Sequence, residues 1–176
     1  LVANWLKHDP VEMKPVAQSQ YLATLEKTRH RYNGYNLLFG DINSLKVYNN
    51  VNNSTHIIDT GVYGLSNADI ATPWPKVTQG VTALNNYVTK QNIINDEDLF
   101  DILRYDNKAD DALLPDTGVG YEWEKALSSI FIQSEKYGTR TSTLLLVDKN
   151  NTLTWKERRF SDKGEAQETR AFSFSI

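Results

Sequence analysis

Two short stretches of the chain carry side chains that could do chemistry. The first, "GVYGLSNADIATPWPK" at residues 61–76, places Asn67 and Trp74 where a strand-like run gives way to a helix-like one. The second, "KYGTRTST" at residues 136–143, places Arg140 at the start of the most apolar strand-like run. An amide N–H and a guanidinium can both hold a bound anion, or stabilise negative charge that develops in a reaction.

Both residues also have structural interpretations. From the residues alone, Asn67 is better explained as a turn residue or a helix cap, because Asn side chains bond readily to nearby backbone. Arg140 is better explained as one half of a structural ion pair, because a cation entering a buried strand needs an anion or several acceptors. The residues alone leave both alternatives open. Lys156, Arg158 and Arg159 form a basic patch that is more typical of a solvated strand face than of a binding groove.

Composition excludes several other kinds of site. The three His residues lack metal-ligand spacing, and with no Cys the chain has no disulfide, thiolate zinc site or Cys nucleophile. The net charge of -3 does not indicate a nucleic-acid partner, and no apolar run approaches the ~20 residues that span a bilayer. We therefore predict no metal, no cofactor, no nucleic acid and no membrane span. The absence of Cys permits a reducing compartment, and a cytoplasmic location is the expectation.

The helical periodicity predicts three helices that would position these stretches. Residues 14–29 carry Ala17, Tyr21, Leu25 and Thr28 on one face. Residues 74–90 follow a predicted N-cap at Thr72 and a first-turn Pro73, and should pack on a sheet through an apolar face made of Val77, Val81, Leu84 and Val88. "DEDLFDILRY" predicts a short third helix with acids in its first turn, and residues 106–120 are typical of a loop.

Strand-like segments make up most of the remainder. They are expected at residues 35–41, 46–50, 56–59, 62–66, 129–133, 140–147, 153–160 and 169–175, with "DKNN" as a hairpin turn. The apolar run "TLLLV" at residues 143–147 predicts a strand buried on both faces, beneath helices or a second sheet. The pattern therefore predicts a mixed α/β fold in a single domain over residues 1–176.

The chain contains "YNGYNLLFGD", "GVYGLSNADIATPWPKV", "LSSIFIQSEKYGTRTSTLLLVD" and "WKERRF" followed by "ETRAFSFSI". In order and spacing these stretches resemble the NRDE family, also called the Transport and Golgi organisation protein 2 family, over nearly the whole chain. The resemblance implies an α/β fold of the α+β type, an N-terminal-nucleophile-hydrolase-like αββα sandwich that is incomplete in this chain.

The resemblance also implies roles for individual residues. In related choloylglycine-type hydrolases, an Asn after an inner strand donates to the oxyanion, and a later Arg lies beside the nucleophile. Asn67 in "GLSN" and Arg140 in "YGTR" match those two positions. Trp74 would supply an apolar wall. The residues expected to bind ligand around this pair are Ser66, Trp74, Thr139 and Thr141.

The chain departs from the family pattern at its start. Full-length members begin Met-Cys and carry an Asn-Arg-Asp-Glu motif, and this chain has neither. We therefore expect the C-terminal two thirds of a longer protein, with no catalysis by this chain alone, because Leu1 has no nucleophilic side chain.

The functions that the resemblance implies are of two kinds. The leading one is binding of a small amphipathic anion, acyl-coenzyme A-like or haem-related. The alternative is part of a cysteine-nucleophile amide or thioester hydrolase whose nucleophile lies upstream. Besides a small-molecule ligand, the expected partner is the upstream segment of the same protein, or another copy that associates through exposed strand edges.

Overall fold

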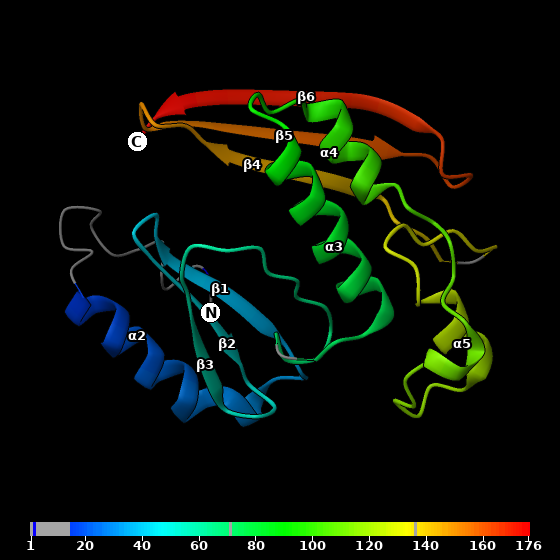
Figure 1. The fold of residues 1–176 in the computed structure, drawn as a ribbon. Helices are drawn as coiled ribbons and strands as arrows, with labels where there is room; N and C mark the ends of the chain where they lie inside the picture. The colour runs from blue at the N-terminus through cyan, green and yellow to red at the C-terminus, as the bar shows by residue number, and fades with distance from the viewer. Residues whose placement is uncertain (1, 3–14, 71, 136) are drawn as a thin grey trace. The chain divides into compact units, whose positions relative to one another are not determined.

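The computed structural model describes residues 2, 15–70, 72–135 and 137–176. They divide into two compact units, Leu1–Thr72 and Pro73–Ile176, and each unit contains one three-stranded antiparallel sheet (Figure 1). The predicted mixed α/β class is confirmed at this level. No helix in the described part of the chain combines the length and the apolar character needed to cross a membrane.

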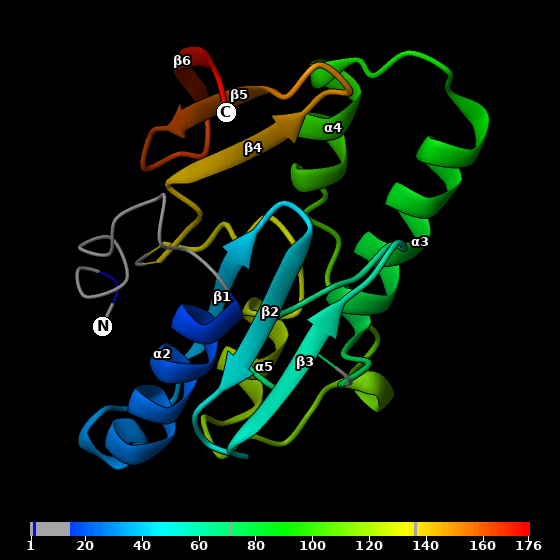
Figure 2. The same ribbon diagram turned by 90° about the vertical axis from the view of Figure 1, so that its left-hand side faces the viewer.

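The first unit packs one helix on one face of its sheet (Figure 2). Helix α2 (Pro15–Thr28) is followed by the 3-10 turn η2 (Arg29–Arg31) and by strands β1 (Asn36–Asp41), β2 (Ser44–Asn49) and β3 (Ser54–Ile58). Tyr21 and Leu25 of α2 are buried against Phe39 and Tyr48 of the sheet, as their helical spacing predicted. The side chain of Ala17 lies outside the described residues. The strand predicted at residues 62–66 is wrong, because this segment pairs with no neighbour and runs as irregular chain.

The β1–β2 hairpin depends on a glycine. Gly40 has a φ of +134°, and a Cβ at this position would lie 2.1 Å from the carbonyl oxygen of Ser44. Asp41 Oδ1 accepts a hydrogen bond of 2.8 Å from the Asn43 N–H, which closes the turn. The two-residue connection therefore fixes the register that places Asn36 opposite Asn49.

The second unit begins with helices. They are α3 (Pro75–Lys90), α4 (Asp96–Leu103), the 3-10 turn η3 (Asp111–Leu113) and α5 (Tyr121–Ala126). The cap predicted at Thr72 is wrong: Trp74 is the N-cap residue and Pro75 is the first helical residue, because proline's fixed φ suits the first turn. Helix α4 starts as predicted, with the Asn95 side chain accepting from the Glu97 N–H and three acids in its first turn.

The second sheet follows these helices. It consists of β4 (Thr141–Val147), β5 (Thr152–Phe160) and β6 (Ala166–Ser175), and the "DKNN" hairpin between β4 and β5 is confirmed. Its turn closes through Asp148, and Asn151 adopts a φ of 57° there. The strand predicted at residues 129–133 is wrong, since only an isolated bridge joins Gln133 to Gly138.

The two faces of this second sheet differ. Helix α4 lies against one of them, where Leu144 packs with Leu99 and Phe100 (Figure 1). On the same face Lys156 pairs with Asp96, and Arg158 pairs with Glu97 at 2.6 Å, so these cations do not form a solvated patch.

We call the opposite face the open face. It carries residues of the other alternation: Thr141, Thr143, Leu145, Val147, Leu153, Trp155, Glu157, Arg159, Arg170, Phe172 and Phe174.

The prediction that the "TLLLV" strand is buried on both faces is wrong. Along β4, Ser142 and Leu144 are buried whereas Leu145 is 55% exposed. The apolar face predicted for α3 is confirmed only in part. Leu84 joins the cluster around Leu99, Phe100 and Leu144, but Val88 is exposed and Tyr87 packs there instead.

Candidate functional site

Asn67 lies on a turn that is fixed from β1. The side-chain amide of Asn36 donates to the carbonyl oxygens of Ser66 at 2.9 Å and of Ala68 at 2.8 Å. These two bonds hold the backbone on both sides of Asn67. The Asn67 side chain itself is exposed and makes no hydrogen bond within the described residues, so its amide is available to a ligand.

Asn36 is in turn held by a second buried amide. Asn49 donates to Asn36 Oδ1 at 2.9 Å, and the other end of the Asn49 amide accepts from the Asn52 N–H at 2.8 Å. Asn49 is buried, so its amide needs these partners. We did not predict this network from the sequence. The signal that could have revealed it is Asn within two paired strands, where Asn is disfavoured unless it bonds.

Asp69 anchors the far side of the same turn. Its Oδ2 accepts from Ser54 Oγ at 2.7 Å and from the Asn52 amide at 3.3 Å, and its Oδ1 accepts from the Ile70 N–H at 2.7 Å. His56 Nε2 lies 2.9 Å from Oδ1. Burial disfavours the charged carboxylate, but the hydrogen bonds outweigh burial, and the pKa of Asp69 lies below its ordinary value.

The lowered pKa makes the first unit sensitive to acid. A carboxyl group whose pKa is depressed by folding contributes stability above its unfolded value of 3.8, and this contribution is lost as pH falls through the lower folded pKa. We expect Asp69→Asn to cost about 1–3 kcal/mol near neutral pH, because it removes charge-assisted hydrogen bonds. Urea unfolding of both proteins from neutral pH down to about pH 3 measures this difference, which should shrink with acid. A difference that stays constant with pH would show that Asp69 does not carry the charge.

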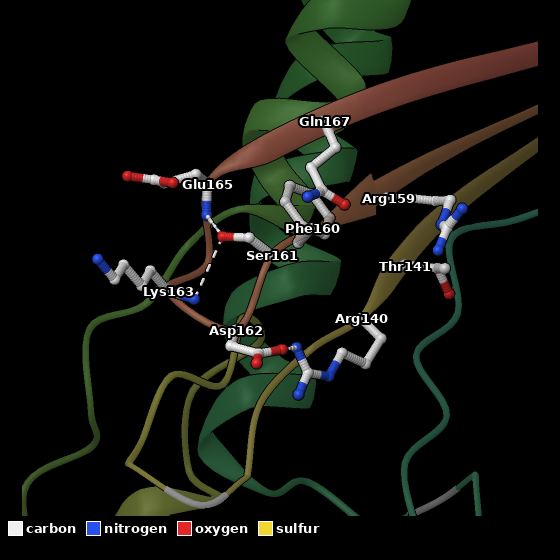
Figure 3. Close-up of a pocket in the computed structure, with 9 residues that line it drawn as sticks. All are labelled: Arg140, Thr141, Arg159, Phe160, Ser161, Asp162, Lys163, Glu165 and Gln167. Carbon is white, nitrogen blue, oxygen red and sulfur yellow. Dashed lines mark hydrogen bonds and ion pairs between the residues drawn. The ribbon is translucent and has the colours of Figure 1, made fainter.

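Arg140 lies at an open cavity of about 730 Å³ at one end of the second sheet (Figure 3). The cavity is lined by the start of β4, the end of β5, the β5–β6 connection and the start of β6. The lining residues are Arg140, Thr141, Arg159, Phe160, Ser161, Asp162, Lys163, Glu165 and Gln167. Of the six predicted site residues, Arg140 and Thr141 are in this set.

The cations of the cavity are not equally engaged. Arg140 forms an ion pair with Asp162, as one of its two interpretations predicted, and both side chains are mostly exposed. Arg159 stands opposite Thr141 in the sheet register and makes no hydrogen bond or ion pair within the described residues, although Glu168 lies within electrostatic range. Lys163 and Glu165 point away from Arg159 (Figure 3). The available donors are therefore Arg159 and the unused N–H groups of Arg140.

The remaining predicted residues have structural contacts. Thr139 accepts from the Ile132 N–H at 2.9 Å through its hydroxyl, and it does not line the cavity. Trp74 is the N-cap of α3 and its ring lies 5.6 Å from Lys76 Nζ. Ser66 contributes its carbonyl oxygen to the bond from Asn36.

A single site that contains Asn67, Trp74 and Arg140 stays a prediction. Arg159 also lines the cavity, although the sequence did not indicate it as a candidate, because it lies beside Thr141 only through the register of β4 and β5.

The donor set does not indicate metal chemistry. Among the residues that the structure describes, no group of three or more His, Asp or Glu side chains could hold a metal ion. The cavity offers guanidinium, ammonium, hydroxyl and amide donors suited to an oxyanion, and the carboxylates of Asp162 and Glu165 also line it.

Comparison with known proteins finds one protein family and three similar relatives. A sequence model of the family described as Transport and Golgi organisation 2 matches residues 1–162. The chain is similar to the human Transport and Golgi organization protein 2 homolog, with 32% identity over 190 residues, covering 100% of this chain and 67% of the human one. The mouse homolog is 31% identical over 170 residues, covering 89% and 62%. The bovine homolog is 31% identical over 171 residues, covering 90% and 60%. The chain thus spans roughly three fifths to two thirds of the length of these relatives.

Proposed function

Since the chain belongs to the Transport and Golgi organisation 2 family, we propose that it binds a small amphipathic anion, acyl-coenzyme A-like or haem-related. We place the anionic group at the cavity beside β4. The observation that carries this proposal is that Arg140, Thr141 and Arg159 line one open cavity, where Arg159 has no ion-pair partner among the residues that the structure describes. Its volume of about 730 Å³ lies within the range of small-molecule sites.

The chemistry of recognition follows from the donors. A carboxylate or phosphate accepts two parallel N–H bonds from one guanidinium, and Arg159 offers such a pair without losing a protein partner. Arg140 already pairs with the carboxylate of Asp162. A ligand anion would bind beside this carboxylate or replace it. Because this ion pair is exposed to water, its exchange for a ligand carboxylate costs little.

Family resemblance supports further members of the site. Asn67 would be a second anion donor and Trp74 an apolar wall, with Ser66 and Thr139 holding the backbone around them. For the fold of the intact protein we propose, on family resemblance, an N-terminal-nucleophile-hydrolase-like αββα sandwich.

A second candidate function is that the chain forms part of a cysteine-nucleophile amide or thioester hydrolase. The observation that favours it is the unbonded Asn67 amide on a turn fixed from both sides, as an oxyanion donor requires. The chain contains no Cys, so its nucleophile would lie in another part of the protein. Self-association through the strand edges at β4 and β6 also stays a proposal.

Binding of butyl phosphate and butyrate, measured by calorimetry, tests the anion site. We expect Arg159→Met and Arg140→Met each to weaken binding by roughly 2- to 5-fold, because a charge pair that is exposed to water contributes about 0.5–1 kcal/mol. Arg31→Met is the matched control, since Arg31 is exposed on η2 and remote in sequence from the cavity. Equal affinities for all four proteins would refute the proposed site.

A further inference from the structure

Asn33 and Gly34 form the one Asn-Gly pair in the chain, and they lie between the 3-10 turn η2 and strand β1. An Asn side chain reaches the backbone of the residues that follow it, and a glycine in the next position has no Cβ to obstruct that approach. A Cβ at Gly34 would also lie 3.0 Å from Val51 Cγ2, so the local packing favours glycine here.

The groups that could react with each other are not engaged elsewhere. The Asn33 side-chain amide makes no hydrogen bond within the described residues, and the same is true of the Gly34 N–H. Residues 32–34 form a bend that belongs to no helix or strand. The Gly34 nitrogen can therefore approach the Asn33 side-chain carbon, Cγ, without first breaking a bond.

The two Asn-Ser pairs of the chain differ in this respect. Asn43–Ser44 and Asn53–Ser54 also place a small residue after Asn, but each serine begins a paired strand. The Asn53 side-chain oxygen in addition accepts a hydrogen bond of 2.9 Å from the Tyr48 hydroxyl. At both pairs the local structure must open before the serine nitrogen can reach the preceding side chain.

We propose that Asn33 is a site of spontaneous deamidation. The Gly34 peptide nitrogen loses its proton and attacks Asn33 Cγ. The new N–Cγ bond closes a succinimide ring, and the Cγ–Nδ2 bond breaks as ammonia leaves with that proton. Water then adds to one of the two ring carbonyls. Opening at Cγ leaves aspartate, and opening at the main-chain carbonyl leaves isoaspartate, whose main chain continues through Cβ and Cγ. Every group in the reaction belongs to the first unit, and water is the co-reactant.

The isoaspartate product conflicts with the hydrogen bonds around it. The Asn50 amide donates to the Asn33 carbonyl oxygen at 3.1 Å and accepts from the Tyr35 N–H at 2.6 Å. Asn50 is 4% exposed, and its second N–H already donates to the Arg29 carbonyl oxygen at 3.1 Å.

One buried amide thus holds the chain on both sides of the reacting bond. Isoaspartate adds a methylene to the main chain between Asn33 and Gly34, and it turns the Asn33 carbonyl group into a carboxylate on a branch. The bonds from Asn50 to Asn33 and Tyr35 cannot both keep their geometry, and the lost one leaves a buried polar group unsatisfied. Deamidation at Asn33 therefore loosens the start of β1.

Peptide mass spectrometry of the whole chain, sampled during incubation in mildly alkaline buffer, tests the site. We expect the peptide that contains Asn33 to gain about one dalton, and protein isoaspartyl methyltransferase with S-adenosylmethionine to label it. In the folded chain Asn33 should react at least about tenfold faster than Asn43 or Asn53, which require local opening. Urea should accelerate the reactions at Asn43 and Asn53, and leave the rate at Asn33 within about twofold.

Asn33→Gln is the matched control, because Gln keeps the amide but would have to close a larger ring. It should show no mass gain at this position. Hydrogen exchange at the Tyr35 amide should become faster in the aged parent and stay unchanged in aged Asn33→Gln. An Asn33 that stays unmodified in the folded chain, whether or not it reacts in urea, would refute the site. Unchanged Tyr35 exchange in a fully modified chain would refute the loosening of β1.

Discussion

Replacing Phe100 with Ala is expected to destabilise the second unit by about 3–5 kcal/mol, the usual cost of deleting a buried aromatic ring. Phe100 is 3% exposed and packs with Leu99 and Leu144, which joins α4 to β4. The Arg158 guanidinium lies 4.0 Å from the centre of its ring and holds Glu97. The substitution therefore removes both the apolar contact and the surface on which that ion pair is stacked. Urea unfolding followed by circular dichroism measures the loss.

Phe174→Ala is the control for this prediction. It makes the same chemical change on the open face of the sheet, where Phe174 is 53% exposed and is paired only with Leu153, and we expect a loss of at most about 1 kcal/mol. If both variants lost several kcal/mol, Phe174 would have to be buried in solution. The open face would then be covered in solution.

The contrast between these two phenylalanines shows what local pattern can predict. Alternation and helical spacing depend on nearby residues, so the pattern predicted β1, β4, β5, α3 and α4 at close to their observed positions. Which face is covered depends on contacts distant in sequence. The run "TLLLV" therefore indicated a strand buried on both faces, although Leu145 and Val147 are exposed.

The candidate site has the same limit. Family resemblance indicated Arg140 and Thr141, which both line the cavity, and their roles stay a prediction. Arg159 is beside them only because β5 runs antiparallel to β4 in one particular register, and no local signal gives that register. Asn36 and Asn49 were missed because a side-chain network between strands has no spacing of its own in the sequence.

Replacing Asn36 with Asp is expected to detach the turn that carries Asn67. The carboxylate keeps the acceptor for Asn49 but replaces the donor that bonds the carbonyl oxygens of Ser66 and Ala68. An anion facing two half-buried carbonyl oxygens is repelled by both, and we expect the first unit to lose about 2–4 kcal/mol. Faster hydrogen exchange at the Ile70 and Thr72 amides, which bond within this turn, would report the local opening.

Asn53→Asp is the matched control for this change. Asn53 uses only its side-chain oxygen, which accepts from the Tyr48 hydroxyl at 2.9 Å, and its positive φ is one that Asp tolerates. The same amide-to-carboxylate replacement should therefore leave stability and exchange nearly unchanged. Unchanged exchange at Ile70 and Thr72 in Asn36→Asp would show that the turn is held without the Asn36 bonds.

The fixed turn also bears on what Asn67 does. A hydrogen-bond donor contributes most to binding when its position is set before the ligand arrives, because no ordering cost is then incurred on association. Asn36 and Asp69 supply that order from two sides, while the Asn67 amide makes no hydrogen bond to the described part of the chain. Asn36→Asp should consequently weaken the binding of any anion that Asn67 holds, although Asn67 itself is unchanged. If Asn67 holds an anion, binding and local order should decline together in Asn36→Asp and in neither case in Asn53→Asp.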